Sequence, residues 1–182
     1  MAISPHTIID FWFSDQVKDQ WFASTPALDQ EIKDRYAAVW KAAAQHDLDD
    51  WCVTPLGSLA LVIVLDQFPL NMFRNQPLSF STEQQAIEVA RQAIDRQQDQ
   101  QIEKDKLAFL YMPLMHSEQL SDQDQAVALY RAAGLTHNMR FSEHHRAIIQ
   151  QYGRFPHRNA ILSRASSAEE LAYLASDQAF MG

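Results

Sequence analysis

A hydroxyl residue followed directly by proline occurs three times in this chain, and each pair predicts the start of a helix. The pairs are Ser4-Pro5, Thr25-Pro26 and Thr54-Pro55. A serine or threonine side chain accepts a hydrogen bond from the first helical turn, and proline fits the first helical position because its missing N–H would have no partner there. Only four of the 182 residues are glycine, against the usual ~7%, so tight turns between strands have few places to form.

Apolar residues recur at helical spacing between these signals. The segment from Leu56 to Phe68 is apolar on every side, as in a buried central helix. Val62-Ile63-Val64 within it could instead form a buried strand, but no second strand candidate exists to pair with it. Two capping boxes, at Ser81-Thr82-Glu83-Gln84 and Ser166-Ser167-Ala168-Glu169, predict further helix starts. We therefore expect an all-α protein of about eight helices, with no sheet, forming a single domain over residues 1–182.

The charge of the chain is uneven. The net charge is −8, which disfavours nucleic acid as a partner because phosphate binding needs a basic surface. Residues 140–164 nevertheless carry five arginines against Glu143 alone, which gives this segment +4 and leaves −12 on the remainder. A local cationic patch on an acidic protein suits a small anion. The same arginines could equally pair with acidic side chains elsewhere in the fold.

Cysteine usage and hydropathy indicate a cytoplasmic protein. Cys52 is the only cysteine, so no intramolecular disulfide can form, and a small buried side chain is expected there. No Lys or Arg precedes the first apolar stretch, as a secretory signal would require. The apolar run from Leu59 to Leu65 is far shorter than the ~20 residues that span a bilayer. We therefore expect no membrane segment. Nucleotide-binding and serine-hydrolase motifs are absent from the sequence, so we expect no cofactor.

Three short segments place charged and amide side chains where an apolar core would be expected. They are residues 66–74, 111–118 and 153–159. Buried polar groups cost free energy unless each finds a partner, so such clusters indicate either an internal network or a lined pocket. The candidate site residues are Asp66, Arg74, His116, Glu118, His145, Arg154, His157 and Arg158.

His116 and Glu118 follow Pro113, which is expected to kink or end a helix running from Glu103 to Gln119. On a regular helix the two side chains would point about 200° apart, so they would converge only if the helix ends there. His116 could act as a general base or acid, with Glu118 or Asp66 as its carboxylate partner. A histidine satisfied by a backbone carbonyl at a helix bend is the structural alternative.

The remaining candidates suit anion binding or structural pairing. Arg154 and Arg158 could each donate two hydrogen bonds to a carboxylate or phosphate, with Arg74 and His157 as further ligand-binding residues. Alternatively, an arginine and Asp66 could lock helices together as a buried ion pair. His145 lies on the apolar stripe of its helix and should face the interior. It could join His116 and Glu118 around a metal ion, but the spacing matches no metal motif and we predict no metal site.

The three polar clusters and the segment Asp10-Phe11-Trp12-Phe13 together resemble a bacterial family, domain-of-unknown-function family 924, over nearly the whole chain. The resemblance implies antiparallel helix pairs in a tetratricopeptide-like superhelical array, and it supplies no function. Two positions depart from the family pattern: Leu70 stands for an arginine and Asn75 for a glycine. Both departures weaken the case for anion binding through several arginines in the loop after Phe68.

Three functions follow from these patterns. The first is binding of an anionic small molecule or peptide terminus, gripped by Arg74, Arg154 and Arg158 in a pocket that the other candidates line. The second is hydrolysis or acyl transfer by a histidine–carboxylate pair. The third is a protein-interaction scaffold whose polar clusters only cross-link helices. Convergence of the three clusters in space would favour the first two functions, and nothing in the sequence predicts the oligomeric state.

Overall fold

The computed structural model describes residues 3–180, and every regular element in that range is helical. The α-helical segments are α1 (Pro5–Trp12), α2 (Asp15–Lys18), α3 (Pro26–Ala44), α4 (Pro55–Val62), α5 (Phe68–Met72), α6 (Glu83–Asp95), α7 (Lys104–His116), α8 (Leu120–Ala132), α9 (Thr136–Tyr152) and α10 (Ala168–Leu174). Short 3-10 turns are η1 (Asp49–Val53), η3 (Pro77–Phe80), η4 (Asp99–Gln101) and η5 (Pro156–Arg158). The all-helical prediction is confirmed for the described residues, with slightly more segments than expected.

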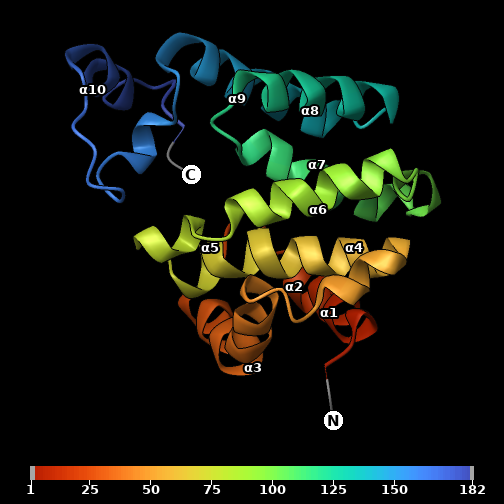
Figure 1. Ribbon diagram of the computed structural model, residues 1–182. Coiled ribbons are helices and arrows are strands. Elements are labelled where there is room, and N and C mark those ends of the chain that lie inside the picture. Colours follow the sequence, from red (N-terminus) through yellow and green to blue (C-terminus); the bar gives the residue numbers. More distant parts are fainter. Residues whose placement is uncertain (1–2, 181–182) are drawn as a thin grey trace.

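The central element is a continuous helix, Pro55–Met72, in which the π-helical turn η2 (Ile63–Gln67) joins α4 to α5. Helices α1 and α3 pack on one side of it, and α6 and α7 on the other (Figure 1). It is long and apolar enough to cross a membrane, but 83% of its apolar window is buried inside the protein. This is the pattern of a core helix in a soluble protein, and the alternative strand at residues 62–64 is wrong.

The predicted helix starts with hydroxyl caps are confirmed. The side chains of Ser4, Thr25 and Thr54 each accept a hydrogen bond from the backbone N–H three residues later. Ser167 opens α10 in a capping box with Glu170, one residue beyond the Ser166–Glu169 pattern. These interactions span a single turn, so the local sequence is sufficient to specify them.

The capping box predicted at Ser81-Thr82-Glu83-Gln84 is wrong, because Ser81 Oγ donates to the Leu78 carbonyl at 2.8 Å and Gln84 Nε2 donates to Glu88 at 3.1 Å. Thr82 begins α6 without capping it, because its hydroxyl donates to the Leu65 carbonyl at 2.6 Å and accepts from Trp40 Nε1 at 3.1 Å. The Glu83 side chain reaches Arg158 instead of turning back to the helix end. Tertiary hydrogen bonds therefore replace a local motif at the start of α6.

Two apolar clusters of unequal size divide the described interior. The larger contains the buried residues of α1 to α8, and the smaller contains Ile148, Ile149 and Phe155 with partly buried side chains of α9, α10 and the C-terminal segment. Helices α8 and α9 extend the array away from the central helix, and α10 lies at the far corner (Figure 1). Polar residues of the three predicted clusters meet where the smaller cluster adjoins the larger.

We predict that Gly57→Ala destabilises the protein more than Gly153→Ala. A Cβ at residue 57 would overlap the Trp51 carbonyl oxygen and lie 2.9 Å from Thr54 Oγ1, so the first turn of α4 would have to move. We expect a loss of about 3 kcal/mol in the free energy of unfolding. Gly153 has open space around it but a φ of 69°, which costs alanine about 1 kcal/mol. Denaturant unfolding followed by circular dichroism measures both, and equal losses would contradict the predicted clash.

Candidate active site: a histidine, carboxylate and arginine network

Asp66 and His116, from two of the three predicted clusters, lie side by side. Oδ1 of Asp66 is 3.0 Å from Nδ1 of His116. The Asp66 side chain is 3% exposed and that of His116 is 18% exposed, so the carboxylate is buried while the imidazole reaches the surface. A carboxylate facing Nδ1 favours the tautomer with its proton on that nitrogen. Nε2, which has no hydrogen-bond partner within residues 3–180, is then free to accept a proton.

The helical backbone explains how these two side chains meet. Asp66 lies in the π-helical turn that interrupts the apolar central helix, and such turns occur frequently at functional sites. Its second oxygen, Oδ2, accepts a hydrogen bond from Gln67 Nε2 at 2.5 Å. His116 is the last residue of α7, three residues beyond Pro113, which lies inside that helix. The helix therefore continues through Pro113 and ends at His116, short of the predicted Gln119, and its end presents His116 to the central helix.

Arg158 connects the third cluster to this pair. Its Nη2 donates to the His116 carbonyl oxygen and its Nη1 donates to Glu83 Oε2, each at 2.8 Å. The guanidinium lies 4.6 Å from the ring centre of Phe80 and 4.7 Å from that of Phe155, which are cation–π distances. Only 7% of the Arg158 side chain is exposed, so this network is largely enclosed.

Glu83 is the member of the network that the sequence analysis missed. Its side chain is 21% exposed. Burial raises the pKa of its carboxyl group, although the positive charges of Arg158 and His116 oppose that effect. The charge of Asp66 adds to the rise, which indicates that the Glu83 carboxylate lies within electrostatic reach of the dyad. Glu83 lies inside the predicted capping pattern at the start of a helix, so nothing in the sequence singled it out as a site residue.

Glu118 faces Arg164 and not His116. Arg164 donates to both carboxylate oxygens, at 2.6 and 2.9 Å, and the Phe155 backbone N–H donates to Oε1 at 2.8 Å. Burial alone would raise the pKa of Glu118, but these hydrogen bonds outweigh it and the pKa is lowered. The structure therefore gives Asp66, and not Glu118, as the carboxylate partner of His116.

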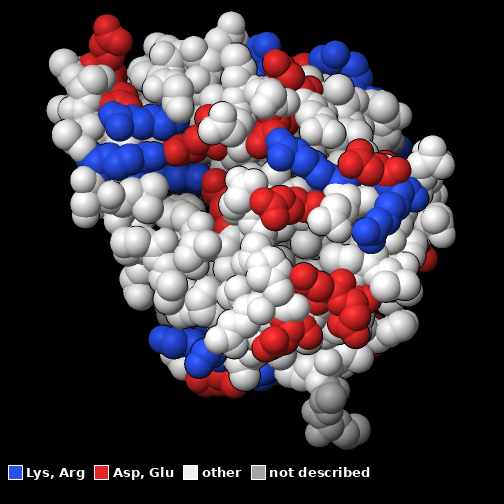
Figure 2. All heavy atoms as spheres, viewed as in Figure 1, with Lys and Arg blue, Asp and Glu red and all other residues white. Residues whose placement is uncertain are grey.

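The other arginines predicted to bind an anion are also paired with carboxylates. Arg74 forms two hydrogen bonds with Asp29 on α3, at 2.8 and 3.1 Å. Arg154 forms two with Glu170 on α10, at 2.6 and 2.8 Å. On the face shown in Figure 2, basic and acidic side chains adjoin one another over the upper part of the molecule, where α9 and α10 lie. Arg74 thus lies apart from the dyad, on the α3 side of the central helix.

His145 and His157 form an aromatic group with Phe155 and Phe180. His145 is 4% exposed, its Nδ1 donates to the Phe141 carbonyl at 2.7 Å, and its ring centre lies 4.3 Å from that of Phe180. The ring of His157 lies 5.0 Å from Phe180. Burial lowers the pKa of His145 to about 4 and that of His157 to about 3, so both are neutral at pH 7. Within residues 3–180, no three His, Cys, Asp or Glu side chains are grouped to hold a metal ion.

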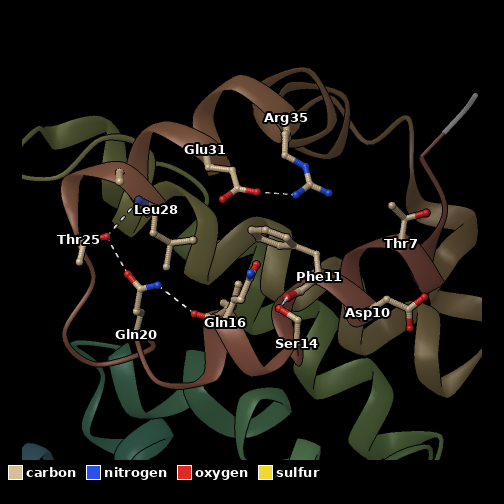
Figure 3. Close-up of a pocket in the computed structure, with 12 residues that line it drawn as sticks. Thr7, Asp10, Phe11, Ser14, Gln16, Gln20, Thr25, Leu28, Glu31 and Arg35 are labelled. Carbon is tan, nitrogen blue, oxygen red and sulfur yellow. Dashed lines mark hydrogen bonds and ion pairs between the residues drawn. The ribbon is translucent and has the colours of Figure 1, made fainter.

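A separate hollow of about 660 Å³ lies between α1, α2 and the start of α3 (Figure 3). One wall carries the Glu31–Arg35 ion pair, at 2.6 Å, with the Arg35 guanidinium over the Phe11 ring. Gln20 and Thr25 form the opposite side, joined by a hydrogen bond of 2.7 Å. None of the predicted site residues lines this hollow. The buried carboxylate–histidine pair is therefore the stronger candidate for chemistry.

Comparison with known proteins supports the family resemblance. The model of a family described as "Bacterial protein of unknown function (DUF924)" matches residues 8–178. A solved structure of a protein of unknown function from Agrobacterium tumefaciens is similar to this chain, with a TM-score of 0.89, 38% sequence identity, and coverage of 94% of this chain and 96% of that one. No curated protein matches. The resemblance and the all-helical class are confirmed, and the tetratricopeptide-like array stays a prediction.

We predict that the protein loses stability in acid through His145. Its pKa is about 4 in the folded protein and about 6.5 in an unfolded chain. Between these values the unfolded state binds more protons, so the free energy of unfolding falls as the pH drops from about 6.5 towards 4. The loss from this residue is on the order of 3 kcal/mol. His157, with a pKa of about 3, adds a loss of the same sign.

The test compares His145→Gln with His144→Gln by denaturant unfolding at several pH values. Glutamine keeps a donor for the Phe141 carbonyl and removes the titration, so His145→Gln should show a shallower pH dependence than wild type. His144 is the exposed neighbour and contributes only a minor part of the lowered pKa of His145, so its replacement should change the dependence much less. A slope that is the same in wild type and His145→Gln would contradict the assignment.

Proposed function

This chain belongs to the bacterial DUF924 family, whose function is unknown, and we propose that it is a hydrolase in which His116 acts as the general base. The observation that carries the proposal is the Asp66–His116 pair. A 3% exposed carboxylate lies 3.0 Å from Nδ1 of a histidine whose ring reaches the surface. A carboxylate on Nδ1 orients the ring and favours the tautomer that leaves Nε2 unprotonated, as a general base requires.

The chemistry assigned to this pair is activation of water. A water molecule bound to Nε2 gives its proton to the imidazole as its oxygen attacks a carbonyl or phosphoryl centre, and the leaving group then takes that proton. The neighbouring hydroxyl is unsuited as a nucleophile, because Ser117 Oγ donates to Asp122 at 2.6 Å and is buried. Cys52 is buried near η1 and its thiol pKa is raised by burial, which disfavours the reactive thiolate.

Hydrolysis is supported better than the two alternatives from the sequence. Binding of an anion requires cationic groups without partners, whereas Arg74, Arg154 and Arg158 each face a carboxylate. A purely structural network has one observation in its favour, the 7% exposure of Arg158. It does not account for a histidine that has one ring nitrogen on a buried carboxylate and the other without a partner among residues 3–180. The free cysteine and the buried apolar helix support a cytoplasmic location for the proposed enzyme.

We predict that His116→Ala lowers hydrolysis by at least about 100-fold, which is the usual contribution of a general base. The purified protein is assayed against panels of esters, amides and phosphoesters. His46→Ala is the matched control, because His46 forms the same contact with Asp49, at 3.1 Å, but both side chains are 61% exposed. Turnover that survives in His116→Ala, or that falls equally in His46→Ala, would exclude this mechanism.

Asp66→Asn separates catalysis from structural support. Asparagine preserves the size of the side chain but cannot stabilise an imidazolium, so we expect a slower rate with a modest loss of stability. Thermal unfolding of the same samples measures the structural part. If the wild type hydrolyses nothing and Asp66→Ala loses several kcal/mol of stability, as unpairing of a buried network does, the structural cross-link becomes the better explanation.

A further inference from the structure

The positive charge of residues 140–164 is largely neutralised in the folded protein. Of its five arginines, four pair with carboxylates that lie outside the segment: Arg146 with Asp124, Arg154 with Glu170, Arg158 with Glu83 and Arg164 with Glu118. A guanidinium that faces a carboxylate has little remaining attraction for a second anion. The segment that looked cationic in the sequence therefore offers little positive charge to a ligand.

The histidines near the dyad supply no positive charge either. His145 and His157 are buried within an aromatic group, and both are neutral at pH 7 because burial disfavours their charged forms. When His116 is itself neutral, as a general base is before it takes a proton, the network around the dyad contains two carboxylates, Asp66 and Glu83, and one cation, Arg158. A single negative charge is left in excess.

The accessible part of that excess charge is on Glu83. Both oxygens of Asp66 have partners, and its side chain is 3% exposed. Glu83 is 21% exposed and uses only Oε2 to accept from Arg158. Its other oxygen, Oε1, has no hydrogen-bond partner in the described part of the chain. Burial raises the pKa of this carboxyl group in spite of Arg158, which means that the ionised group is incompletely solvated and would gain from a further donor.

The position of Glu83 is also fixed. It is the first residue of α6, and its side chain is held by a buried arginine whose guanidinium lies over two aromatic rings. Arg158 binds Glu83 and the His116 carbonyl with the two ends of one guanidinium. The carboxylate and the histidine are therefore connected through a single rigid group.

From this arrangement we propose that the site selects substrates that carry a protonated amine close to the bond that is cleaved. The proposal rests on the hydrolytic function of the dyad. Glu83 Oε1 accepts a hydrogen bond from the ammonium group, and His116 takes a proton from the attacking water. The water oxygen forms a bond to the acyl carbon, the bond to the leaving group breaks, and that group receives the proton from His116. An amino-acyl ester or amide has this combination of groups.

The test uses two series of compounds, amides and esters. Within each series the leaving group is constant and the acyl group carries a different charge in each of three compounds. Aminomethylcoumarin amides, and the corresponding coumarin esters, are made with alanyl, N-acetylalanyl and N-succinylalanyl groups, which are cationic, neutral and anionic. We expect kcat/KM for the alanyl compounds to exceed that for the acetyl compounds by roughly tenfold or more, since a hydrogen bond to a charged group contributes that much. The succinyl compounds should be the poorest substrates.

Variants then assign the preference to Glu83. Glu83→Gln should reduce the alanyl preference to about threefold or less, and Glu83→Asp, which keeps the charge, should retain most of it. Glu118→Gln is the matched control: Glu118 is also held by an arginine but faces away from His116, so the preference should be unchanged. Thermal unfolding of each variant verifies that the Arg158 environment is intact. An unchanged preference in folded Glu83→Gln would overturn the proposal.

Failure of this inference is distinguishable from failure of the hydrolase proposal. Hydrolysis that depends on His116 but shows no preference for the cationic acyl group would overturn the inference alone. If no compound is hydrolysed, binding of benzylamine, benzyl alcohol and benzoate is compared by calorimetry. Benzylamine binding that is lost in Glu83→Gln would support the cationic site without the catalysis. Equal binding of the three probes, no binding of any, or tighter binding of benzoate would overturn it.

Discussion

Burial of the Asp66 carboxylate inside an otherwise apolar helix is the constraint on which the rest of this arrangement depends. The Asp66 side chain is 3% exposed, so its carboxylate needs partners inside the protein. His116 contacts one of its oxygens and Gln67 donates a hydrogen bond to the other. His116 is held at the end of α7 by Arg158, which binds its carbonyl oxygen. Arg158 is itself a buried cation and requires Glu83. Each buried polar or charged group in this network therefore needs the next one as a partner, and removal of any member leaves another group buried and unpaired.

This dependence also joins the two apolar clusters, because η2, α6 and α7 pack with the larger and η5 with the smaller. Cross-linking alone does not require charged groups, since apolar side chains of similar volume commonly stabilise a protein at least as well as a buried ion pair. Apolar packing could not, however, provide an imidazole with one nitrogen on a carboxylate and the other without a partner in the part of the chain that the structure describes. The network therefore points to chemistry more strongly than to mechanical support.

Sequence and structure agree where an interaction spans one turn of helix. The caps at Ser4, Thr25 and Thr54 involve neighbouring residues only, so the local sequence predicts them. Sequence and structure differ at the start of α6, where a local capping pattern was predicted. Thr82 and Glu83 instead form hydrogen bonds with partners 17 and 75 residues away in the chain, respectively. The π-helical turn at Asp66 was likewise beyond prediction, because apolar periodicity does not distinguish it from a regular helix.

Three members of the network were singled out from the sequence, whereas Glu83 and the pairings between the members were not. Asp66, His116 and Arg158 stood out because charged groups in apolar surroundings need partners, but helical phase alone could not say which partner each would meet. The partner of each charged side chain decides whether the charge that remains accessible to a ligand is positive or negative. Composition counts every charge in residues 140–164, whereas a ligand meets only the charges that the fold leaves unpaired. Once the arginines are matched with carboxylates from other elements, the accessible charge nearest the dyad is that of Glu83, and the ligand that we propose for the site changes from an anion to a cation.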